Sequence, residues 1–255
     1  MLNQQLLEKY DIPAPRYTSY PTVPYWDEAP NIDNWISSLK SSLEGDSSWS
    51  LYLHIPFCES LCTFCGCNTT ITKNHDLEED YVDHVLREWN LYLEKVPEIK
   101  MKKLRQIHLG GGTPTFLKAK NLKRLLKPIL DNVTYDASEL EASIEVDPRK
   151  TTKDQLEVLA ELGFNRISLG VQDFNHKVQE LVNRVQSFEM TKSITDTARE
   201  LGFNSINFDL IYGLPCQGPD EIAKTTDLTI ELRPDRIALY SLAIVPWIKP
   251  AQKKF

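Results

Sequence analysis

The chain has 255 residues, of which 41% are hydrophobic and 25% are charged, a composition typical of a globular protein and too apolar for a disordered one. Its net charge of −7 would repel a phosphate backbone, and its basic residues are not clustered, so nucleic acid is excluded as the expected partner. No run approaches the roughly 18 to 20 apolar residues of a membrane-spanning helix, and the first ten residues lack the apolar segment of a signal peptide. The sequence therefore predicts a soluble, cytoplasmic protein with no membrane partner.

From residue 49 onward, short apolar runs alternate with longer amphipathic segments, a pattern typical of βα units around a parallel sheet. We expect six strands, at residues 51–57, 106–110, 142–146, 166–171, 205–212 and 236–242. We expect helices between them, at residues 77–95, 121–132, 152–162, 191–201 and 220–231. Right-handed crossovers between such strands give an α/β fold, a partial (β/α)6 barrel of parallel strands.

Residues 1–48 differ from the rest of the chain because prolines at positions 13, 15, 21, 24 and 30 interrupt them. Proline removes a backbone donor and stops helices. We therefore expect an irregular N-terminal arm with short helices at residues 1–48, followed by the barrel core at residues 49–255. No helical pattern follows the sixth strand, so we expect the apolar run at residues 244–248 to be partly uncovered.

The first long helix, at residues 77–95, carries signals at its start and along one face. Asp76 can cap this helix while Glu79 reaches back to it, as in a capping box. Apolar residues spaced four apart predict a buried stripe, formed by Tyr81, Val85, Trp89 and Leu93.

The pentapeptide Glu-Leu-Gly-Phe-Asn occurs twice, at residues 161–165 and 200–204. Each copy closes a predicted helix and opens a predicted strand. We expect Gly163 and Gly202 to take the left-handed conformation that ends a helix without a Cβ clash. The phenylalanine that follows each glycine can then pack under the incoming strand. The repeat supports an architecture of successive βα units.

Four of the five cysteines lie within ten positions, at Cys58, Cys62, Cys65 and Cys67, and Cys216 is far from them. An odd number of cysteines in a long chain without a signal peptide argues against a disulfide framework. Three thiolates spaced Cys-x3-Cys-x2-Cys can bind three corners of a four-iron cluster and leave the fourth iron open. Structural zinc with Cys67 as the fourth ligand is one alternative, and unligated core cysteines are another.

Polar residues and glycines gather where the predicted strands end. Residues 110–115 close the second strand, Glu145 and Gln172 lie at the ends of the third and fourth, and Asp209 lies within the fifth. Because parallel strands present their carboxyl ends at one edge of the sheet, we expect these residues to lie near the cysteines, which follow the first strand.

Seven segments together resemble the family of oxygen-independent coproporphyrinogen III oxidases, within the radical S-adenosylmethionine (SAM) superfamily. They are residues 16–22 (RYTSYPT), 51–58 (LYLHIPFC), 65–68 (CGCN), 110–115 (GGGTPT), 144–149 (IEVDPR), 170–174 (GVQDF) and 209–215 (DLIYGLP). A haem chaperone that shares the cluster motif is the alternative. In that family Asp-Phe follows the third cysteine, whereas Gly66 and Cys67 follow it here, so the oxidases are favoured.

The resemblance implies a [4Fe–4S] cluster held by Cys58, Cys62 and Cys65, with SAM on its fourth iron. It implies that two SAM molecules bind, at positions matched here by Tyr52, Phe64, Cys67, Gly112, Thr113, Pro114, Glu145, Gln172, Arg184, Asp209 and Ala243. Tyr52 and His54 are the candidates for catalytic contacts. His108 is interpreted as structural.

The resemblance also implies a reaction of haem biosynthesis. In this family two propionates of coproporphyrinogen III are oxidatively decarboxylated to vinyl groups without oxygen, which gives protoporphyrinogen IX. It implies an electron donor such as flavodoxin or ferredoxin and a monomeric chain, with Arg16, Arg149 and Arg184 as candidate cations for the substrate. The family's C-terminal helical domain has no counterpart in these 255 residues, so an inactive cluster- and SAM-binding fragment is a further alternative.

Overall fold

The structure, a computed structural model, describes residues 3–10, 31–247 and 249–255, and the chain divides into two compact units, Met1–Ser41 and Ser42–Phe255. The first unit contains α1 (Gln4–Tyr10) and most of α2 (Ile32–Ser42). Asn31 caps α2, because its Oδ1 accepts a hydrogen bond of 2.8 Å from the amide of Asn34. The expected motif at residues 16–22, including Arg16, lies outside the described residues.

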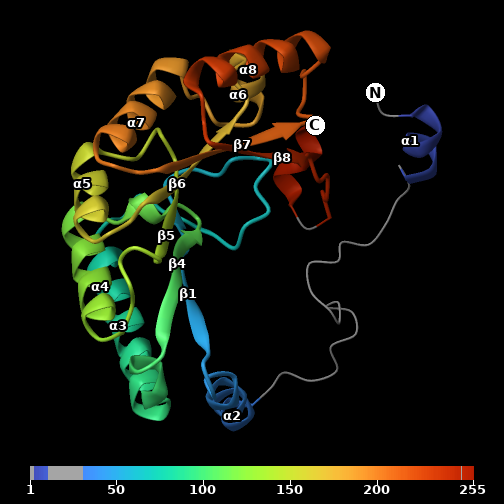
Figure 1. Cartoon of the computed structure of the whole chain (residues 1–255). Coiled ribbons are helices and arrows are strands. Elements are labelled where there is room, and N and C mark those ends of the chain that lie inside the picture. The colour runs from blue at the N-terminus through green and yellow to red at the C-terminus, as the bar shows by residue number, and fades with distance from the viewer. Residues whose placement is uncertain (1–2, 11–30, 248) are drawn as a thin grey trace. The chain divides into compact units, whose positions relative to one another are not determined.

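The second unit is built on a sheet of six parallel strands, in the order β1-β4-β5-β6-β7-β8 (Figure 1). The strands are β1 (Ser48–Ile55), β4 (Lys103–Gly111), β5 (Glu141–Val146), β6 (Arg166–Gln172), β7 (Ser205–Tyr212) and β8 (Arg236–Ser241). All six expected strands are confirmed to within three residues at each end. The spatial order follows the chain order, which confirms the expected α/β architecture of a partial barrel.

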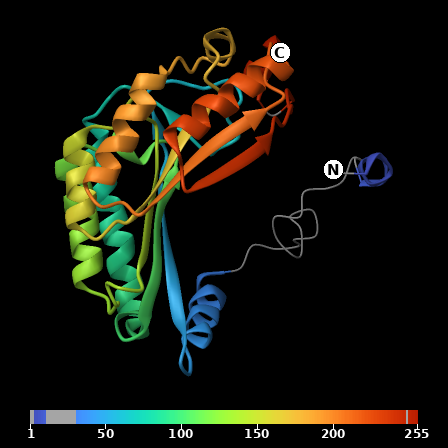
Figure 2. The same cartoon turned by 45° about the horizontal axis from the view of Figure 1, so that its top comes forward.

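Five helices cover one face of this sheet in chain order (Figures 1 and 2). They are α3 (Leu77–Lys95), α4 (Ala119–Asp131), α5 (Lys153–Glu161), α7 (Phe188–Glu200) and α8 (Pro219–Leu232). The core lies between the two layers, where Ile107, Ile144 and Phe208 of the sheet are fully buried. Helix α7 begins three residues before the expected start because Ser187 caps it, accepting a 3.1 Å bond from the Met190 amide.

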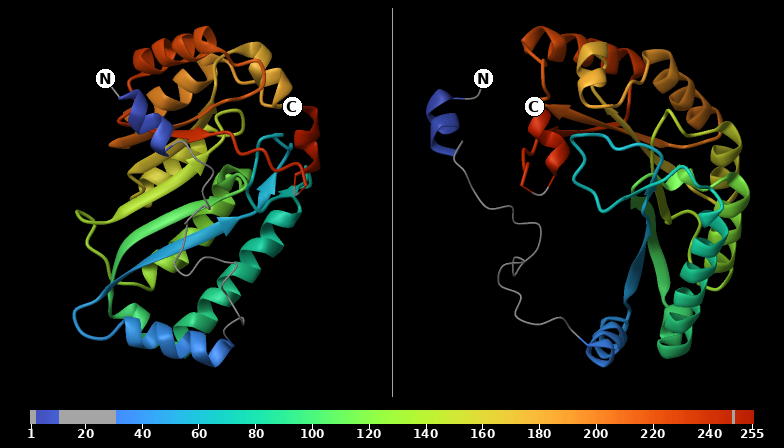
Figure 3. Two further views of the ribbon diagram at one scale, coloured as in Figure 1. Left: turned by 90° about the vertical axis from the view of Figure 1, so that its right-hand side faces the viewer. Right: turned by 180° about the vertical axis from the view of Figure 1, so that it is seen from behind.

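Several short elements were not expected from the sequence. Helix α6 (His176–Leu181) lies between β6 and α7, and three 3₁₀ turns are present, η2 (Pro97–Lys100), η3 (Pro114–Phe116) and η4 (Pro250–Lys254). The strands β2 (Phe57–Cys58) and β3 (Thr70–Ile71) pair in parallel. They bracket the cysteine loop, which we define as residues 58–67. Figure 3 shows this loop beside the C-terminal segment. Within the described ranges, every helix is too short or too polar to cross a lipid bilayer.

The expected capping box at the start of α3 is wrong. Asp76 has helical dihedral angles, φ −65° and ψ −19°, and its side chain makes no capping bond. Glu78, which is fully buried, instead accepts hydrogen bonds of 2.9 Å from the Lys118 amide and 2.8 Å from Asn121 Nδ2 at the start of α4. Glu78 therefore links the start of α3 to the start of α4.

The expected stripe along α3 is partly right. Trp89 and Leu93 are buried, while Tyr81 and Val85 are half-buried and Val82 is fully buried. The buried face is therefore rotated slightly from the predicted one.

The repeated pentapeptide acts as predicted. Gly163 and Gly202 have φ values of +85° and +90°, and each directly follows the last turn of a helix. Phe164 and Phe203 are 3% and 4% exposed. The two copies thus end α5 and α7 in the same way.

Candidate functional site

The sheet face opposite the helix layer carries polar side chains in register across the strands. Tyr52 pairs with His108 and His108 with Ser143. One step further along, Glu145 pairs with Ser168. Because side chains alternate along a strand, the buried apolar residues between these positions face the helices. The polar face is the one available to a ligand.

Tyr52, His54 and Glu145 are brought together at one end of this face. The hydroxyl of Tyr52 is 2.9 Å from His54 Nδ1, and His54 Nε2 is 2.9 Å from the Asn68 carbonyl oxygen in the cysteine-loop region. Burial, with the negative charge of Glu145, raises the pKa of Tyr52. The Tyr52 side chain is nevertheless more than half exposed, so it can contact a ligand.

His108 contacts these residues, and its structural role stays a prediction. Its ring stacks on Tyr52 with centroids 5.8 Å apart, and its Nε2 lies 3.3 Å from Glu145 Oε1. Its Nδ1 lies 2.7 Å from Ser143 Oγ. His108 precedes Gly110 by two residues, and this spacing, which the sequence shows, places both residues on the same face of β4.

Asp209 is held in a polar network on β6 and β7. Its carboxylate accepts hydrogen bonds of 2.8 Å from Ser168 Oγ and 2.9 Å from Asn207 Nδ2. Burial raises the pKa of Asp209, and these hydrogen bonds oppose that effect. The network fixes the carboxylate on the inner face.

The four clustered cysteines follow the carboxyl end of β1. Cys58 ends β2, Cys62 is buried, and Cys67 is exposed. The Cys58 thiol shares a 3.3 Å hydrogen bond with Thr113 Oγ1, and the Cys65 amide donates to the Cys62 carbonyl at 3.0 Å. Cys62 and Cys65 therefore lie on one tight turn, and Cys58 lies at the end of the strand before it.

The thiols of the cysteine loop are electrostatically unequal. Burial raises the pKa of Cys58. A hydrogen bond with Cys67 lowers the pKa of Cys65 to about 6, and the positive charges of Lys249 and Arg184 act in the same direction. The same bond raises the pKa of Cys67. Of Cys58, Cys65 and Cys67, Cys65 is thus the thiol that most readily becomes the thiolate that binds metals.

Two arginines, both paired with one carboxylate, lie beside the sulfur of Cys62. Arg149 Nη2 and Arg184 Nη1 each lie 3.6 Å from Cys62 Sγ. Both pair with Asp147 Oδ2, at 2.6 and 3.2 Å. Burial favours a higher pKa for Asp147, but the charge of Arg184 and the bonds from Arg149 outweigh it and hold this pKa below its ordinary value.

The glycine-rich segment at residues 110–115 begins at the end of β4 and forms hydrogen bonds with the backbone that leads into the cysteine loop. The Gly112 amide donates to the Ile55 carbonyl at 2.8 Å, and the Thr113 amide donates to the Phe57 carbonyl at 2.9 Å. A Cβ atom at Gly112 would lie 2.6 Å from the Pro56 oxygen. Only glycine permits this approach, and the buried Pro114 then begins η3.

Gln172 and Arg184 meet over Gly170 at the end of β6. A Cβ atom at Gly170 would lie 2.8 Å from Arg184 Nη2 and 2.9 Å from Gln172 Nε2. Arg184 Nη2 donates to the Gly170 carbonyl at 2.6 Å. Gln172 has a left-handed φ of +67° and follows a shift in the register between β6 and β7. Its side chain is thereby brought beside Arg184.

Phe64 and Ala243 are held by contacts of their own. Phe64 packs on Val178 and Val182 of the α6 region, and the Ala243 carbonyl accepts a 3.0 Å bond from Gln252. Within the described ranges, no hydrogen bond joins Asp209 or Ala243 to the cysteine loop. The expected site residues thus form several groups along the carboxyl edge of the sheet.

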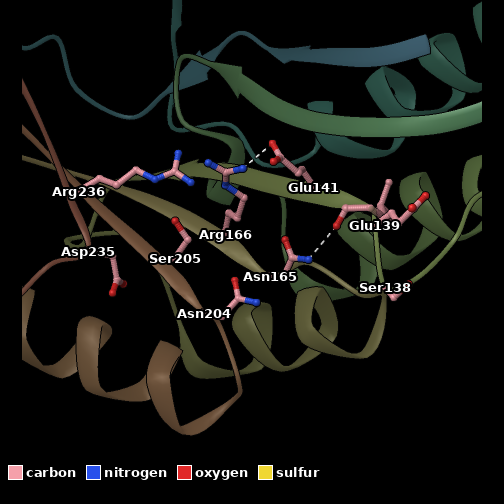
Figure 4. A pocket seen from close by; sticks show the side chains of 10 residues that line it. Ser138, Glu139, Glu141, Asn165, Arg166, Asn204, Ser205, Asp235 and Arg236 are labelled. Atoms are coloured by element: carbon pink, nitrogen blue, oxygen red, sulfur yellow. Dashed lines mark hydrogen bonds and ion pairs between the residues drawn. The ribbon is translucent and has the colours of Figure 1, made fainter. Parts of the chain in front are cut away.

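A polar cavity of about 450 Å³ lies at the opposite, amino-terminal edge (Figure 4). Its lining includes Glu141, Arg166, Ser205 and Arg236, which are the first residues of β5 to β8. Arg166 forms an ion pair with Glu141. None of the expected site residues lies here, so this cavity and the cysteine loop are at different ends of the strands.

The residues present fit an iron–sulfur cluster with a carboxylate-bearing ligand. Cys58, Cys62 and Cys65 are free thiols on one loop and can supply three thiolates to such a cluster. The Nε atom of Arg184 is buried and has no hydrogen-bond partner among the described residues. An unpaired buried donor is costly, and a ligand carboxylate beside Cys62 would satisfy it.

A match to a protein family shows the class to which this chain belongs. The family model of the radical SAM superfamily matches residues 52–229, a range that contains the cysteine loop and the strands β4 to β7. The chain belongs to the radical SAM superfamily.

More specific relatives match almost the whole chain. It is 43% identical over 249 residues to the oxygen-independent coproporphyrinogen III oxidase of Escherichia coli, covering 98% of this chain and 53% of that protein. The enzyme of the same name from Synechocystis sp. is 40% identical over 250 residues, with coverage of 98% and 53%. The chain spans about half the length of the curated relatives it matches.

Two solved structures are similar to this chain. Coproporphyrinogen III oxidase (HemN) from Escherichia coli superposes with a TM-score of 0.88 at 41% identity, covering 98% of this chain and 55% of that one. The radical SAM methyltransferase TsrM from Kitasatospora setae gives a TM-score of 0.57 at 15% identity, covering 84% and 37%. The second likeness concerns the fold alone.

Proposed function

We propose that this chain is the radical SAM part of an oxygen-independent coproporphyrinogen III oxidase, with an N-terminal arm at residues 1–48 and its barrel core at residues 49–255. It would serve haem biosynthesis in the cytoplasm by oxidative decarboxylation of two propionates of coproporphyrinogen III to vinyl groups. The observation that carries this proposal is the cysteine loop at the carboxyl edge of the sheet, bound to the glycine-rich segment through Cys58 and Thr113. The relatives named for this activity match 98% of the chain.

In this proposal Cys58, Cys62 and Cys65 hold a [4Fe–4S] cluster. Two SAM molecules bind along the carboxyl edge, at Tyr52, Phe64, Cys67, Gly112, Thr113, Pro114, Glu145, Gln172, Arg184, Asp209 and Ala243. When bound, the cluster and SAM supply the electron transfer and radical chemistry that amino-acid side chains lack.

The chain's own residues bind and orient these groups. Arg184 suits a carboxylate, because its Nε is a buried donor without a partner among the described residues. Glu145 and Asp209 suit an ammonium group or ribose hydroxyls. Gly112 lets backbone groups approach a ligand, and Tyr52 with His54 can contact the substrate. The electron donor belongs to the flavodoxin or ferredoxin class, and the chain acts as a monomer.

Anaerobic reconstitution with iron and sulfide, followed by electron paramagnetic resonance (EPR) of the reduced protein, tests the proposal. We expect a [4Fe–4S] signal that changes when SAM is added. With coproporphyrinogen III and a reductant, we expect deoxyadenosine and vinyl products. The Cys62→Ser variant should lose the cluster, whereas Cys216→Ser, at an exposed cysteine outside the loop, should retain it.

Other outcomes would assign the chain differently. Uptake of zinc without any cluster would refute the radical SAM chemistry. A shift of the Soret band on haem titration, with no turnover of coproporphyrinogen III, would identify a haem chaperone. A cluster that responds to SAM in a chain without turnover would identify a binding module that needs further polypeptide.

A further inference from the structure

Asp147 and Arg149 belong to the conspicuous segment at residues 144–149, yet neither holds SAM in the proposed function. Their side chains are only 8% and 15% exposed. Arg149 Nε and Nη2 donate to Asp147 at 2.9 and 2.6 Å, and the Arg149 amide donates to Asp147 Oδ1 at 3.0 Å. The bonds from Nε and Nη2 to one carboxylate fix the plane of the guanidinium.

The fixed guanidinium is directed at one thiol. Arg149 Nη2 reaches Cys62 Sγ at 3.6 Å, within the range of an N–H···S hydrogen bond. Arg184 Nη1 lies at the same distance from this sulfur. Both arginines pair with the single carboxylate of Asp147, so the guanidinium of Arg149 is held with its Nη2 towards Cys62. Cys58, in contrast, is bonded to the neutral hydroxyl of Thr113.

We propose that Arg149, oriented by Asp147, is a positioning residue that raises the reduction potential of the cluster bound through Cys62. The inference rests on the proposed function only in that Cys62 must be a cluster ligand. One electron from an external low-potential donor reduces the cluster, and the donor is oxidised. The reduced cluster carries one more negative charge, so a buried N–H···S bond and a nearby cation stabilise it more than the oxidised cluster.

The test is an anaerobic redox titration of the reconstituted full chain, followed by EPR, on Arg149→Met, Arg149→Lys and wild type. We expect Arg149→Met to lower the ratio of reduced to oxidised cluster about tenfold at a fixed applied potential, a shift of about 59 mV for one electron. Arg149→Lys retains the charge but loses the fixed fork, so its potential should lie between those of Arg149→Met and wild type. The control Lys153→Met removes an exposed charge near Glu157 and should leave the potential unchanged.

Each other outcome decides against the proposal. Equal potentials for Arg149→Met and wild type would overturn it. Variants that fold by circular dichroism but incorporate no iron would show that Arg149 serves assembly instead. If Arg149→Met does not fold, Arg149→Lys decides, since an unshifted potential there refutes the tuning role. A wild-type chain that takes up no cluster would refute the proposed function itself, which is a different result from an unshifted potential.

Discussion

Gly112 and Pro56 approach each other so closely that no side chain fits between them, since a Cβ atom at Gly112 would lie 2.6 Å from the Pro56 oxygen. The Gly112 amide also donates to the Ile55 carbonyl at 2.8 Å. Pro56 directly precedes β2, the strand that ends in Cys58. The end of β4 therefore sets the position from which the cysteine loop departs.

Replacing this glycine should loosen that junction. We expect Gly112→Ala to lower the free energy of unfolding of the cluster-free protein by about 1–3 kcal/mol, because the clash is with backbone that cannot rotate away. Urea denaturation measures the change. Gly66→Ala is the matched control within the cysteine loop, since an added Cβ there meets nothing within 4 Å. Equal effects of the two substitutions would contradict the role assigned to Gly112.

Glu78 should be the carboxylate on which the packing of α3 against α4 depends. It is fully buried, and besides its bonds to Lys118 and Asn121 it lies 2.7 Å from His75 Nδ1. Glu78→Ala leaves the buried Asn121 side chain and the amide of Lys118 without their acceptor, so we expect a loss of about 2–4 kcal/mol in the free energy of unfolding.

The next residue provides the control for Glu78→Ala. The Glu79 side chain is 62% exposed and pairs with Lys120 at 3.2 Å. Glu79→Ala should therefore change the free energy of unfolding by less than about 0.5 kcal/mol. Urea denaturation curves that coincide for the two variants would show that the buried contacts of Glu78 contribute nothing measurable.

How α3 begins also shows where prediction from sequence stops. The bounds of α3 and β7 were predicted to the residue, because a long amphipathic helix and an alternating strand each carry a periodic apolar pattern. The capping box at Asp76 was wrong although its residue types were suitable. The donors to Glu78 come from residues 40 and 43 positions further along the chain. No local sequence pattern could therefore predict these hydrogen bonds.

In the site, too, local features could be predicted from the sequence, whereas contacts between distant residues could not. The grouping of cysteines on one loop could be predicted, because four residues within ten positions must be close in space. The arginines at Cys62 could not be predicted as a pair, since they lie 87 and 122 positions from it. Their meeting depends on how β5 and the α6 region end at the same edge of the sheet.

The buried pairing of Asp147 should make stability depend on pH. Its lowered pKa means that the ionised carboxylate is favoured in the folded state. The stabilisation is therefore complete above the ordinary value of 3.8 and is lost as the pH falls through the lower pKa of the folded protein. Asp147→Asn should cost about 3–5 kcal/mol at pH 7, because it leaves two arginines without their carboxylate.

Urea denaturation of wild type and Asp147→Asn at several pH values measures this dependence. The difference between the two proteins should be constant from about pH 7 to pH 5 and shrink below about pH 4. Glu157→Gln, which removes an exposed carboxylate 3.8 Å from Lys153, should show a small difference throughout. A difference for Asp147→Asn that grows on acidification would have the wrong sign for a lowered pKa.

Glu141 and Glu145 lie on the same face of β5, but Glu141 is at the amino-terminal end of this strand and Glu145 is near its carboxyl end. Glu145 is beside His108 at the carboxyl edge, whereas Glu141 lines the amino-terminal cavity with Arg166. If SAM binds at the carboxyl edge, Glu145→Gln should weaken its binding by about 10- to 100-fold, since a hydrogen bond to a charged group contributes about 1.5–3 kcal/mol.

Anaerobic calorimetry with SAM and the reconstituted protein makes this comparison. Glu141→Gln removes the same charge from the same strand, so it should leave SAM affinity within about twofold of wild type, an effect under about 0.5 kcal/mol. The pair of variants separates a local contact from the effect of net charge, because both change the net charge equally. Loss of affinity in Glu141→Gln but not in Glu145→Gln would place the SAM site in the amino-terminal cavity, and equal losses would attribute the effect to charge alone.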